Sequence, residues 1–218
     1  MKRLKGVLIE FNILSQIGWN FIFKVIGTLL SFLIISISIK YLGSEVYGSW
    51  AAVFAIIGWL SILDLGIGSS LKNSIGENNS SKNLIKLKSI ISTTYVALFT
   101  IALTIWISFE LTKQYVSWDY LFNNSFEQET LKIVARNIFY TFLVIFIGKI
   151  SFAILNANHK SHFGSISIAV TNLILIALLF YFQQVGQNKA EKLVIYSRLI
   201  LISNFINYFF INSITDLV

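Results

Sequence analysis

The sequence contains no cysteine and no proline, and only 12% of its 218 residues are charged. Without cysteine, neither disulfides nor thiolate metal sites can form. Without proline, glycine is left as the residue that breaks or bends a helix. Because a soluble domain carries about 25% charged residues, this chain cannot cover a surface that faces water. Its 56% hydrophobic residues and mean hydropathy of +0.73 therefore predict a membrane protein.

Long apolar runs divide the sequence into blocks of the length that a membrane-spanning helix requires, which is about 20 residues. The six qualifying blocks are residues 17–39, 46–71, 90–109, 133–155, 163–182 and 193–214. The predicted fold is all-α, a polytopic bundle of six transmembrane helices, with residues 1–218 forming a single lobe. The apolar run of the first block is too long for a cleavable signal peptide, and no small-residue cleavage site follows it.

The placement of basic and aromatic residues predicts how these helices are oriented. With both termini in the cytoplasm, the inner segments carry more lysine and arginine than the outer loops, chiefly around the first two helices, which usually set the topology. Tyr41, Tyr47 and Trp50 then surround the first outer turn, where lipid headgroups favour tyrosine and tryptophan. We therefore expect the N-terminus and the C-terminus on the cytoplasmic side.

The segment 72–89 is the longest predicted cytoplasmic loop. It begins with turn-forming residues and ends in a basic amphipathic strip, "KNLIKLK" (82–88). Such a strip is attracted to the anionic lipids of the cytoplasmic leaflet, so anionic membrane lipids are expected partners. The alternative is an ordinary cytoplasmic loop with the usual excess of lysine.

Two ionisable residues lie well inside predicted spans, where such residues are costly and usually face a cavity or a partner. Lys24 and Asp64 stand on consecutive antiparallel helices, each about seven residues and thus roughly 10 Å from the cytoplasmic end. An ion pair between them is therefore geometrically feasible. In the alternative interpretations, Lys24 extends to the headgroups, the ion pair is purely structural, or Gly66 and Gly68 mark a frayed helix end.

Polar residues form stripes at helical spacing along three of the predicted spans. The stripes are Asn20, Lys24, Thr28, Ser31 and Ser38 on the first span, Thr93, Thr100, Thr104 and Ser108 on the third, and Ser197, Asn204 and Asn207 on the sixth. Three stripes favour a bundle around a water-filled lumen, although such stripes also mediate ordinary helix packing. The candidate lumen residues are Lys24, Asp64, Asn20, Thr28, Ser31, Thr100, Thr104, Asn204 and Asn207.

Sequence patterns of enzymes are nearly absent. The two histidines, His159 and His162, stand in a predicted short inner loop, "NHKSH", without a third ligand nearby, so they predict no metal site. No nucleophile elbow, P-loop or glycine-rich dinucleotide pattern occurs. The basic residues are scattered at the ends of apolar blocks rather than gathered on one face. We therefore expect no catalytic residues, no cofactor, no metal and no nucleic-acid partner.

A compact motif occupies residues 41–77, "YLGSEVYGSWAAVFAIIGWLSILDLGIGSSLKNSIGE". It consists of a YLG-x-x-x-YG turn, an apolar helix and then D-x-G-x-G at the predicted cytoplasmic helix end. The residues that carry it are Tyr41, Leu42, Gly43, Tyr47, Gly48, Asp64, Gly66 and Gly68. This segment resembles the N-terminal helix pair of the O-antigen repeat-unit flippases, polysaccharide exporters of the multidrug/oligosaccharidyl-lipid/polysaccharide exporter superfamily.

The resemblance implies a flippase that moves an undecaprenyl-diphosphate-linked oligosaccharide across the bacterial inner membrane for surface polysaccharide assembly. It implies that Lys24 meets the diphosphate, that the polar stripes meet the sugars without strong specificity, and that Asp64 holds Lys24 or responds to a coupling ion or proton. Gly66 and Gly68 would let the helix end flex or pack closely. Members of this family have two six-helix lobes around the cavity, so this chain corresponds to the N-terminal lobe. Its expected partner is a second lobe or a second copy of itself.

Three other interpretations remain. A cation-coupled multidrug antiporter of the same superfamily would use Asp64 as a proton or sodium site. Four bases lie inside the predicted spans against this one acid, namely Lys24, Arg136, Lys149 and Arg198, and this excess favours an anionic substrate. A membrane-embedded glycosyltransferase or acyltransferase would need acids or histidines clustered at one membrane face. An inactive truncated lobe would have no transport role.

Overall fold

The computed structural model describes residues 2–60, 66–80, 84–120 and 126–215 of the chain, and no strand occurs in these ranges. The helices are α1 (Lys2–Leu42), α2 (Ser44–Leu60), α3 (Ile67–Ser80), α4 (Leu84–Thr112), η2 (Trp118–Tyr120), α5 (Gln128–Ala157), α6 (Ser161–Tyr181) and α7 (Lys189–Thr215). The all-α fold class predicted from the sequence is confirmed.

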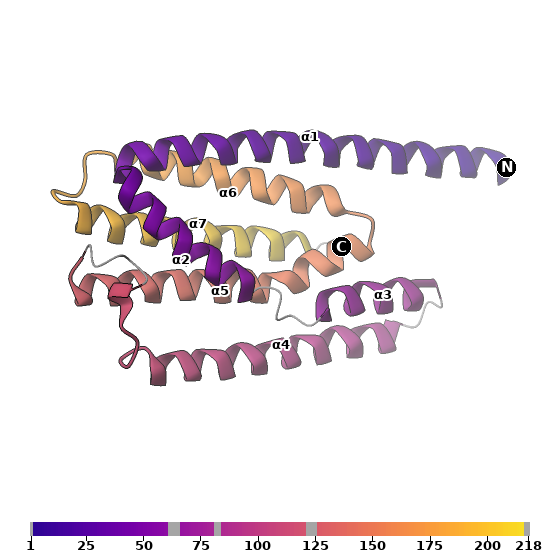
Figure 1. The fold of residues 1–218 in the computed structure, drawn as a ribbon. Helices are drawn as coiled ribbons and strands as arrows, with labels where there is room; N and C mark the ends of the chain where they lie inside the picture. The colour runs from indigo at the N-terminus through magenta and orange to yellow at the C-terminus, as the bar shows by residue number, and fades with distance from the viewer. Residues whose placement is uncertain (1, 61–65, 81–83, 121–125, 216–218) are drawn as a thin grey trace.

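The long helices run side by side (Figure 1). α1 lies at one edge and packs along α6, α6 packs along α7, and α7 packs along α5. α3 and α4 lie at the opposite edge, where both contact α5 and each other. α2 leaves the end of α1 and crosses obliquely toward α5. α1 begins and α7 ends at the same end of the bundle, an arrangement compatible with both termini on one side of a membrane.

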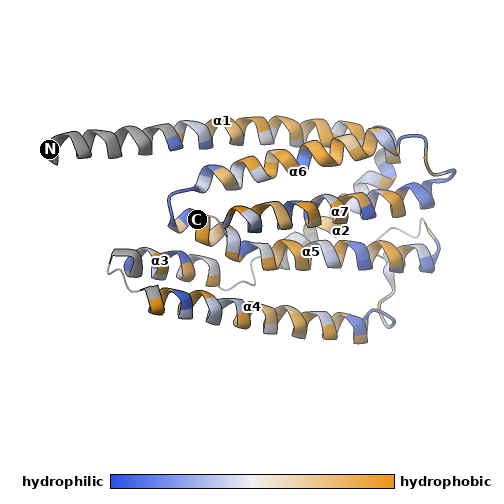
Figure 2. Ribbon diagram, turned by 180° about the vertical axis from the view of Figure 1, so that it is seen from behind, coloured by the Kyte–Doolittle hydropathy of each residue, from blue (hydrophilic) through white to orange (hydrophobic). Residues whose placement is uncertain are grey.

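Among the described residues, five helices are long and apolar enough to cross a membrane, judged by length and composition. The candidate spans are Gln16–Leu42, Ile85–Thr112, Gln128–Ala157, Ser161–Tyr181 and Lys189–Thr215. They overlap the first, third, fourth, fifth and sixth blocks predicted from the sequence. Apolar residues cover most of their length, whereas the turns between them are more polar (Figure 2).

The second predicted span, 46–71, is wrong as one continuous helix. Its residues fall on two helices, because α2 ends at Leu60 and α3 begins at Ile67. Gly66 precedes α3 with a φ of +78°, which lies in the left-handed region that glycine adopts without steric cost. Its carbonyl accepts a hydrogen bond from the Ser70 N–H at 2.8 Å and so begins α3. Hydropathy could not reveal this break, since the apolar composition continues across it.

The prediction of a long loop at 72–89 is also wrong. Most of this segment is helical, in α3 and in the beginning of α4. Leu71 and Ile75, four residues apart, are buried in an apolar cluster with residues of α4 and α5, and this packing holds a sequence of turn formers in a helix. The lysines at 72, 86 and 88 are exposed. Their contact with anionic lipids stays a prediction.

A sharp corner joins α1 to α2. Gly43 has a φ of +87°, and its N–H donates to the Ile39 carbonyl at 2.8 Å, so a left-handed residue closes α1. The Tyr41 hydroxyl donates to the Val185 carbonyl at 3.1 Å and ties this corner to the turn between α6 and α7. Tyr41 and Trp50 are buried. Both side chains therefore pack inside the protein rather than against lipid, and the depth of this corner in a membrane stays a prediction.

Candidate functional site

A groove of about 440 Å³ lies between α1, α2, α6 and α7. Its lining consists of Ser31, Ile34 and Ile35 from α1, Tyr47, Trp50, Ala51, Phe54 and Ala55 from α2, Ile168, Thr171, Asn172 and Leu175 from α6, and Tyr196, Ile200, Ser203, Asn204 and Asn207 from α7. None of these lining side chains carries a charge. The groove therefore combines an apolar wall with neutral hydrogen-bonding groups.

Aromatic side chains of α2 and α7 form one wall of this groove. Trp50 stacks on Phe54 with ring centroids 4.8 Å apart and meets Tyr196 edge to face at 4.9 Å. Tyr47 stacks on Trp50 at 6.1 Å. These separations are typical of favourable aromatic pairs. The Tyr196 hydroxyl also donates to Ser38 Oγ at 2.8 Å, so a hydrogen bond joins this wall to α1.

Trp50 leaves one polar atom unpaired. Its side chain is only 6% exposed, and its buried Nε1 has no hydrogen-bond partner among the described residues. A buried N–H without an acceptor costs roughly 1–3 kcal/mol, and a buried tryptophan usually finds one. The protein thus holds a donor in the wall of the groove that its described residues do not use.

Part of the polar stripe predicted on α1 forms contacts with neighbouring helices. Asn20 Nδ2 donates to Ser161 Oγ at 3.2 Å, and Asn20 Oδ1 accepts from the Ser165 hydroxyl. Ser31 Oγ accepts from Asn172 Nδ2 at 2.9 Å. Such bonds hold helices together within membranes. Of the two predicted residues, Ser31 lines the groove, whereas Asn20 binds α6 outside the groove lining.

The three asparagines of the groove keep hydrogen-bonding capacity. Nδ2 of Asn172 and Nδ2 of Asn204 donate to main-chain carbonyls at 3.0 Å and 2.9 Å, but their Oδ1 atoms accept no hydrogen bond from the described residues. Asn207 Oδ1 accepts from the Ser167 hydroxyl, and its Nδ2 donates to no acceptor in this part of the chain. The groove therefore offers both amide acceptors and an amide donor to a ligand.

Lys24 and Thr28 continue the groove face of α1 toward its N-terminal end. Lys24 precedes Ser31 by seven residues, which on an α-helix is about two turns, or roughly 10 Å, on nearly the same face. Both side chains are exposed, and Thr28 Oγ1 donates to the Lys24 carbonyl at 2.9 Å. Lys24 has no ion-pair partner among the described residues. It therefore adds a positive charge on the groove side of α1 that no described residue pairs with.

Asp64 lies outside the described residues, so its ion pair with Lys24 stays a prediction. Gly66 holds the positive-φ position before α3, and Gly68 lies half-buried in the first turn of that helix. The two glycines predicted to mark a flexible helix end thus stand where one helix gives way to the next. Motion at this point stays a prediction.

Thr100 and Thr104 lie on α4, at the opposite edge of the bundle from α1 (Figure 1). Their hydroxyls donate at 2.8 Å and 2.9 Å to carbonyls four residues earlier on the same helix. α4 packs against α3 and α5, so its stripe does not join the groove. Within the described residues, Ser31 of the α1 stripe and Asn204 and Asn207 of the α7 stripe share a groove, and the stripe of α4 stands apart.

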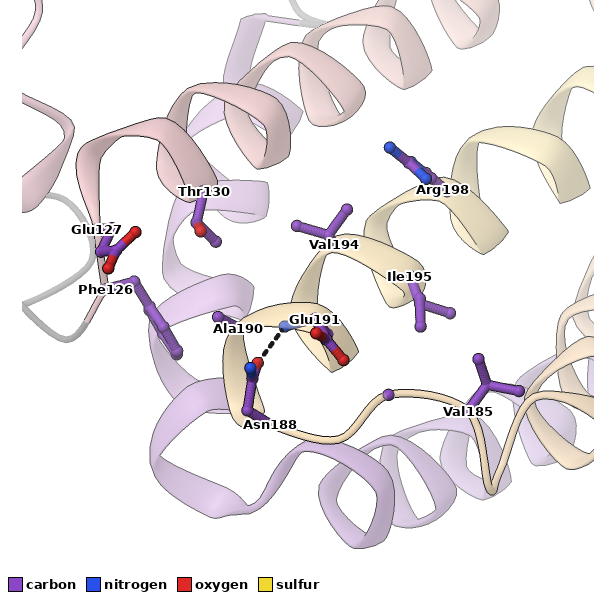
Figure 3. A pocket seen from close by; sticks show the side chains of 11 residues that line it. Phe126, Glu127, Thr130, Val185, Asn188, Ala190, Glu191, Val194, Ile195 and Arg198 are labelled. Carbon is purple, nitrogen blue, oxygen red and sulfur yellow. Dashed lines mark hydrogen bonds between the residues drawn. The ribbon is translucent and has the colours of Figure 1, made fainter.

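A second pocket, of about 570 Å³, lies between the start of α5 and the turn from α6 to α7 (Figure 3). Asn188 caps α7 there, since its Oδ1 accepts from the Glu191 N–H at 2.8 Å. Glu191 Oε2 in turn accepts from the main-chain N–H of residue 187 at 2.8 Å. Glu127 and Arg198 border the pocket with exposed side chains. These polar groups stabilise a helix start and carry both signs of charge, so they favour no single ligand class.

The sequence predicted both histidines in a loop, and this prediction is wrong for His162. His159 is exposed in the turn between α5 and α6, whereas His162 lies half-buried in the first turn of α6.

Sequence reasoning missed Trp50, Asn172 and Tyr196 as residues of the groove. Asn172 carried a usable signal, because it is a lone amide within an apolar span and such a group requires a partner. Trp50 carried a misleading one, because a tryptophan after a turn fits a headgroup position equally well. Tyr196 carried none, since its burial depends on where α2 packs.

Comparison with known proteins adds a relative. A curated protein of Yersinia pseudotuberculosis, named "Putative O-antigen export protein", is 23% identical over 177 residues. The chain is a distant relative of this export protein. The match covers 78% of the chain and 39% of the relative, so the chain spans about two-fifths of the relative's length. No family model and no solved structure matches the chain.

The relative and the helices agree on the class of protein. Five candidate spans and a relative named for export indicate a multi-pass membrane protein. An export protein is a transporter rather than an enzyme, which is the direction that the sequence predicted.

Proposed function

We propose that this chain is one lobe of an exporter that carries an undecaprenyl-diphosphate-linked oligosaccharide across the bacterial inner membrane for surface polysaccharide assembly. The observation that carries the proposal is the uncharged polar groove between α1, α2, α6 and α7. A glycan that crosses a membrane must exchange its hydrogen bonds with water for others, since burying unpaired hydroxyls is costly. The amides of the groove offer such bonds. The similarity to a protein named for O-antigen export supports the same function.

Lys24 has the chemistry to bind the diphosphate. Its ammonium group is a compact charge with three donors, and it lies on the groove side of α1 about two helical turns from Ser31. The lipid tail can remain in the bilayer while the diphosphate meets Lys24 and the sugars extend along the groove. Charge recognition and sugar recognition then occupy different parts of one helix.

A second six-helix lobe, from the same protein or from another copy, completes the site in this proposal. Lys24 and Thr28 are exposed on α1, and a lysine that faces hydrocarbon is costly. An opposing lobe would enclose these residues in a water-filled cavity. Because these 218 residues contain no cysteine, Thr28→Cys provides a single thiol within this lobe for cross-linking. We expect it to cross-link to protein, whereas labelling by lipid-soluble reagents alone would contradict the second lobe.

The competing antiporter function requires a carboxylate that binds a cation. The described groove lining contains none, and Asp64 lies outside the described residues. Export of an anionic lipid-linked glycan is therefore the function that we favour over the antiporter.

The test replaces Lys24 in the complete protein, in the cells that naturally produce it, and is run beside cells from which the protein has been deleted. Lys24→Gln should lower polysaccharide display at least tenfold and cause the lipid-linked oligosaccharide to accumulate, because a neutral amide cannot offset the diphosphate charge. Lys24→Arg should keep most of the display. Lys132→Gln is the matched control, since Lys132 is exposed and pairs with Glu129 at 2.7 Å.

Normal display by Lys24→Gln at equal protein level would refute the diphosphate role. Normal display in cells without the protein would refute the exporter function itself. Loss of ion-driven dye efflux with intact display, on replacement of Asp64 by asparagine, would favour the antiporter.

A further inference from the structure

We propose that the groove selects uncharged sugars over acidic ones, and that Asn204 and Trp50 recognise the sugar. This inference rests on the proposed function and deepens it by naming the class of glycan. The name of the relative assigns no class of sugar, whereas the lining of the groove does.

The lining has aromatic rings, hydroxyls and amides but no lysine, arginine or histidine. A carboxylate brought into this groove would lose water without meeting a cation, and an unpaired charge is far costlier to bury than a hydroxyl. Lys24 lies roughly 10 Å from Ser31 along α1, and in the proposed function it binds the diphosphate. A neutral sugar meets no such penalty, so the groove discriminates by the absence of countercharge.

Asn204 provides an acceptor that is aimed at no described protein group. Its side chain is half-buried in the groove lining. Its Nδ2 donates to the Ile200 carbonyl of its own helix at 2.9 Å, and its Oδ1 is left for a sugar hydroxyl. Because Asn204 bonds to no other helix among the described residues, replacing it should change binding without loosening the bundle.

Trp50 provides a donor from the aromatic wall. Its indole Nε1 is buried without a partner among the described residues. A sugar hydroxyl that accepts from this N–H, once the ring turns toward the groove, would recover the cost of the unpaired donor. Tyr47 and Phe54 flank the indole ring and present apolar surface to the C–H face of a sugar.

The experiment measures sugar binding to the purified protein in lipid nanodiscs by saturation-transfer-difference NMR, which detects weak ligands. The neutral probes are trisaccharides of glucose, of galactose and of N-acetylglucosamine. The acidic probe is trigalacturonate, which has the same number of rings and a carboxylate on each. We expect the dissociation constant of at least one neutral probe to be at least tenfold lower than that of trigalacturonate.

The variants locate the binding in the groove. Asn204→Leu and Trp50→Phe should each weaken binding of the neutral probe about threefold to tenfold, the effect of one neutral hydrogen bond. Ser213→Ala on α7 is the matched control, because Ser213 is exposed and donates only to the Phe209 carbonyl of its own helix. The affinity of the Ser213→Ala variant for the neutral probe should equal that of the unmodified protein. Gel filtration checks that Trp50→Phe folds, and Asn204→Leu decides the test if it does not.

Equal or tighter binding of trigalacturonate would overturn the inference, as would no binding of any neutral probe or unchanged binding by both variants. The exporter function and the sugar selectivity can be refuted independently of each other. If neutral sugars bind as expected but surface polysaccharide does not depend on the protein, the exporter function is wrong and the selectivity stands. If display depends on the protein and the groove shows no preference, the selectivity is wrong and the exporter function stands.

Discussion

The helices α1 and α4 lie at opposite edges of the bundle and satisfy their polar side chains differently (Figure 1). On α1, Asn20 bonds to two serines of α6, and Ser31 accepts from Asn172 of α6. On α4, a whole stripe of hydroxyls donates to carbonyls four residues earlier on the same helix, from Thr93, Thr100, Thr104 and Ser108. The first pattern joins two helices, and the second needs no neighbour.

The difference follows from the chemistry of the side chains. A hydroxyl has a single donor, which a carbonyl of its own helix can accept. An asparagine amide has two donors and an acceptor, which is more than its own helix can satisfy. An asparagine in an apolar helix is therefore the stronger sign of a contact between helices or of a ligand. By this criterion α6 and α7, which carry Asn172, Asn204 and Asn207, belong with α1.

The largest effect on the α1 side should come from Gly27→Leu. Gly27 is buried against α6, and a Cβ at this position would lie 3.5 Å from Ile168 Cγ2 and 3.8 Å from Ala169 N. A methyl group fits at these distances, but a leucine must displace α6, and overpacking costs about 1–3 kcal/mol. We expect denaturant titration in detergent micelles to show a loss of this size in the free energy of unfolding.

Gly18 provides the matched control on the same helix. No heavy atom of the described residues lies within 4 Å of a Cβ built there. Gly18→Leu should therefore leave the free energy of unfolding unchanged or raise it slightly, because leucine favours a helix. Equal stability of Gly18→Leu and Gly27→Leu would mean that α1 does not pack on α6, and the contrast with α4 would lose its basis.

Asn172→Leu should have the next largest effect. It removes the hydrogen bonds from Nδ2 to Ser31 Oγ and to the Gly27 carbonyl. Polar contacts between membrane helices contribute about 0.6 kcal/mol on average and up to about 1.7 kcal/mol, so we expect a loss of about 1 kcal/mol in the same titration. When Ser31→Ala is combined with Asn172→Leu, we expect little further loss in the free energy of unfolding, because both changes remove the hydrogen bond between these two side chains. Full additivity would contradict that bond.

Most of the spans could be predicted from the sequence, because the thickness of a bilayer fixes the length of an apolar run whatever the fold. The span Gln16–Leu42 shows this, since its ends lie close to those of the predicted block 17–39. Hydropathy alone did not predict the break at Gly66, although the D-x-G-x-G motif indicated a helix end there. The positive φ of Gly66 accompanies the packing of Leu71 and Ile75 against α4 and α5, and those contacts join segments far apart in the sequence.

The groove could be predicted only in part. Polar spacing selected Ser31, Asn204 and Asn207, all of which line it, because periodicity shows which residues share a face of a helix. Periodicity does not show which helix that face meets, so the stripe of α4 carried the same signal and lies elsewhere. Trp50 could not be predicted as a groove residue for the same reason, since its burial depends on its contact with Tyr196 of α7.

The smallest effect should come from α4 itself. The double variant of Thr100→Val and Thr104→Val keeps the shape of both side chains and removes only hydroxyls that bond to their own helix. Such bonds to the preceding turn do not stabilise a helix, so we expect the free energy of unfolding to change by less than about 0.5 kcal/mol. Asn172→Leu, titrated in parallel, sets the scale. A loss as large as that of Asn172→Leu would mean that the α4 hydroxyls bond to a partner beyond their own helix, because bonds to their own backbone cannot account for it. The two edges of the bundle would then both be contact surfaces, and a facing lobe would be the natural partner for α4.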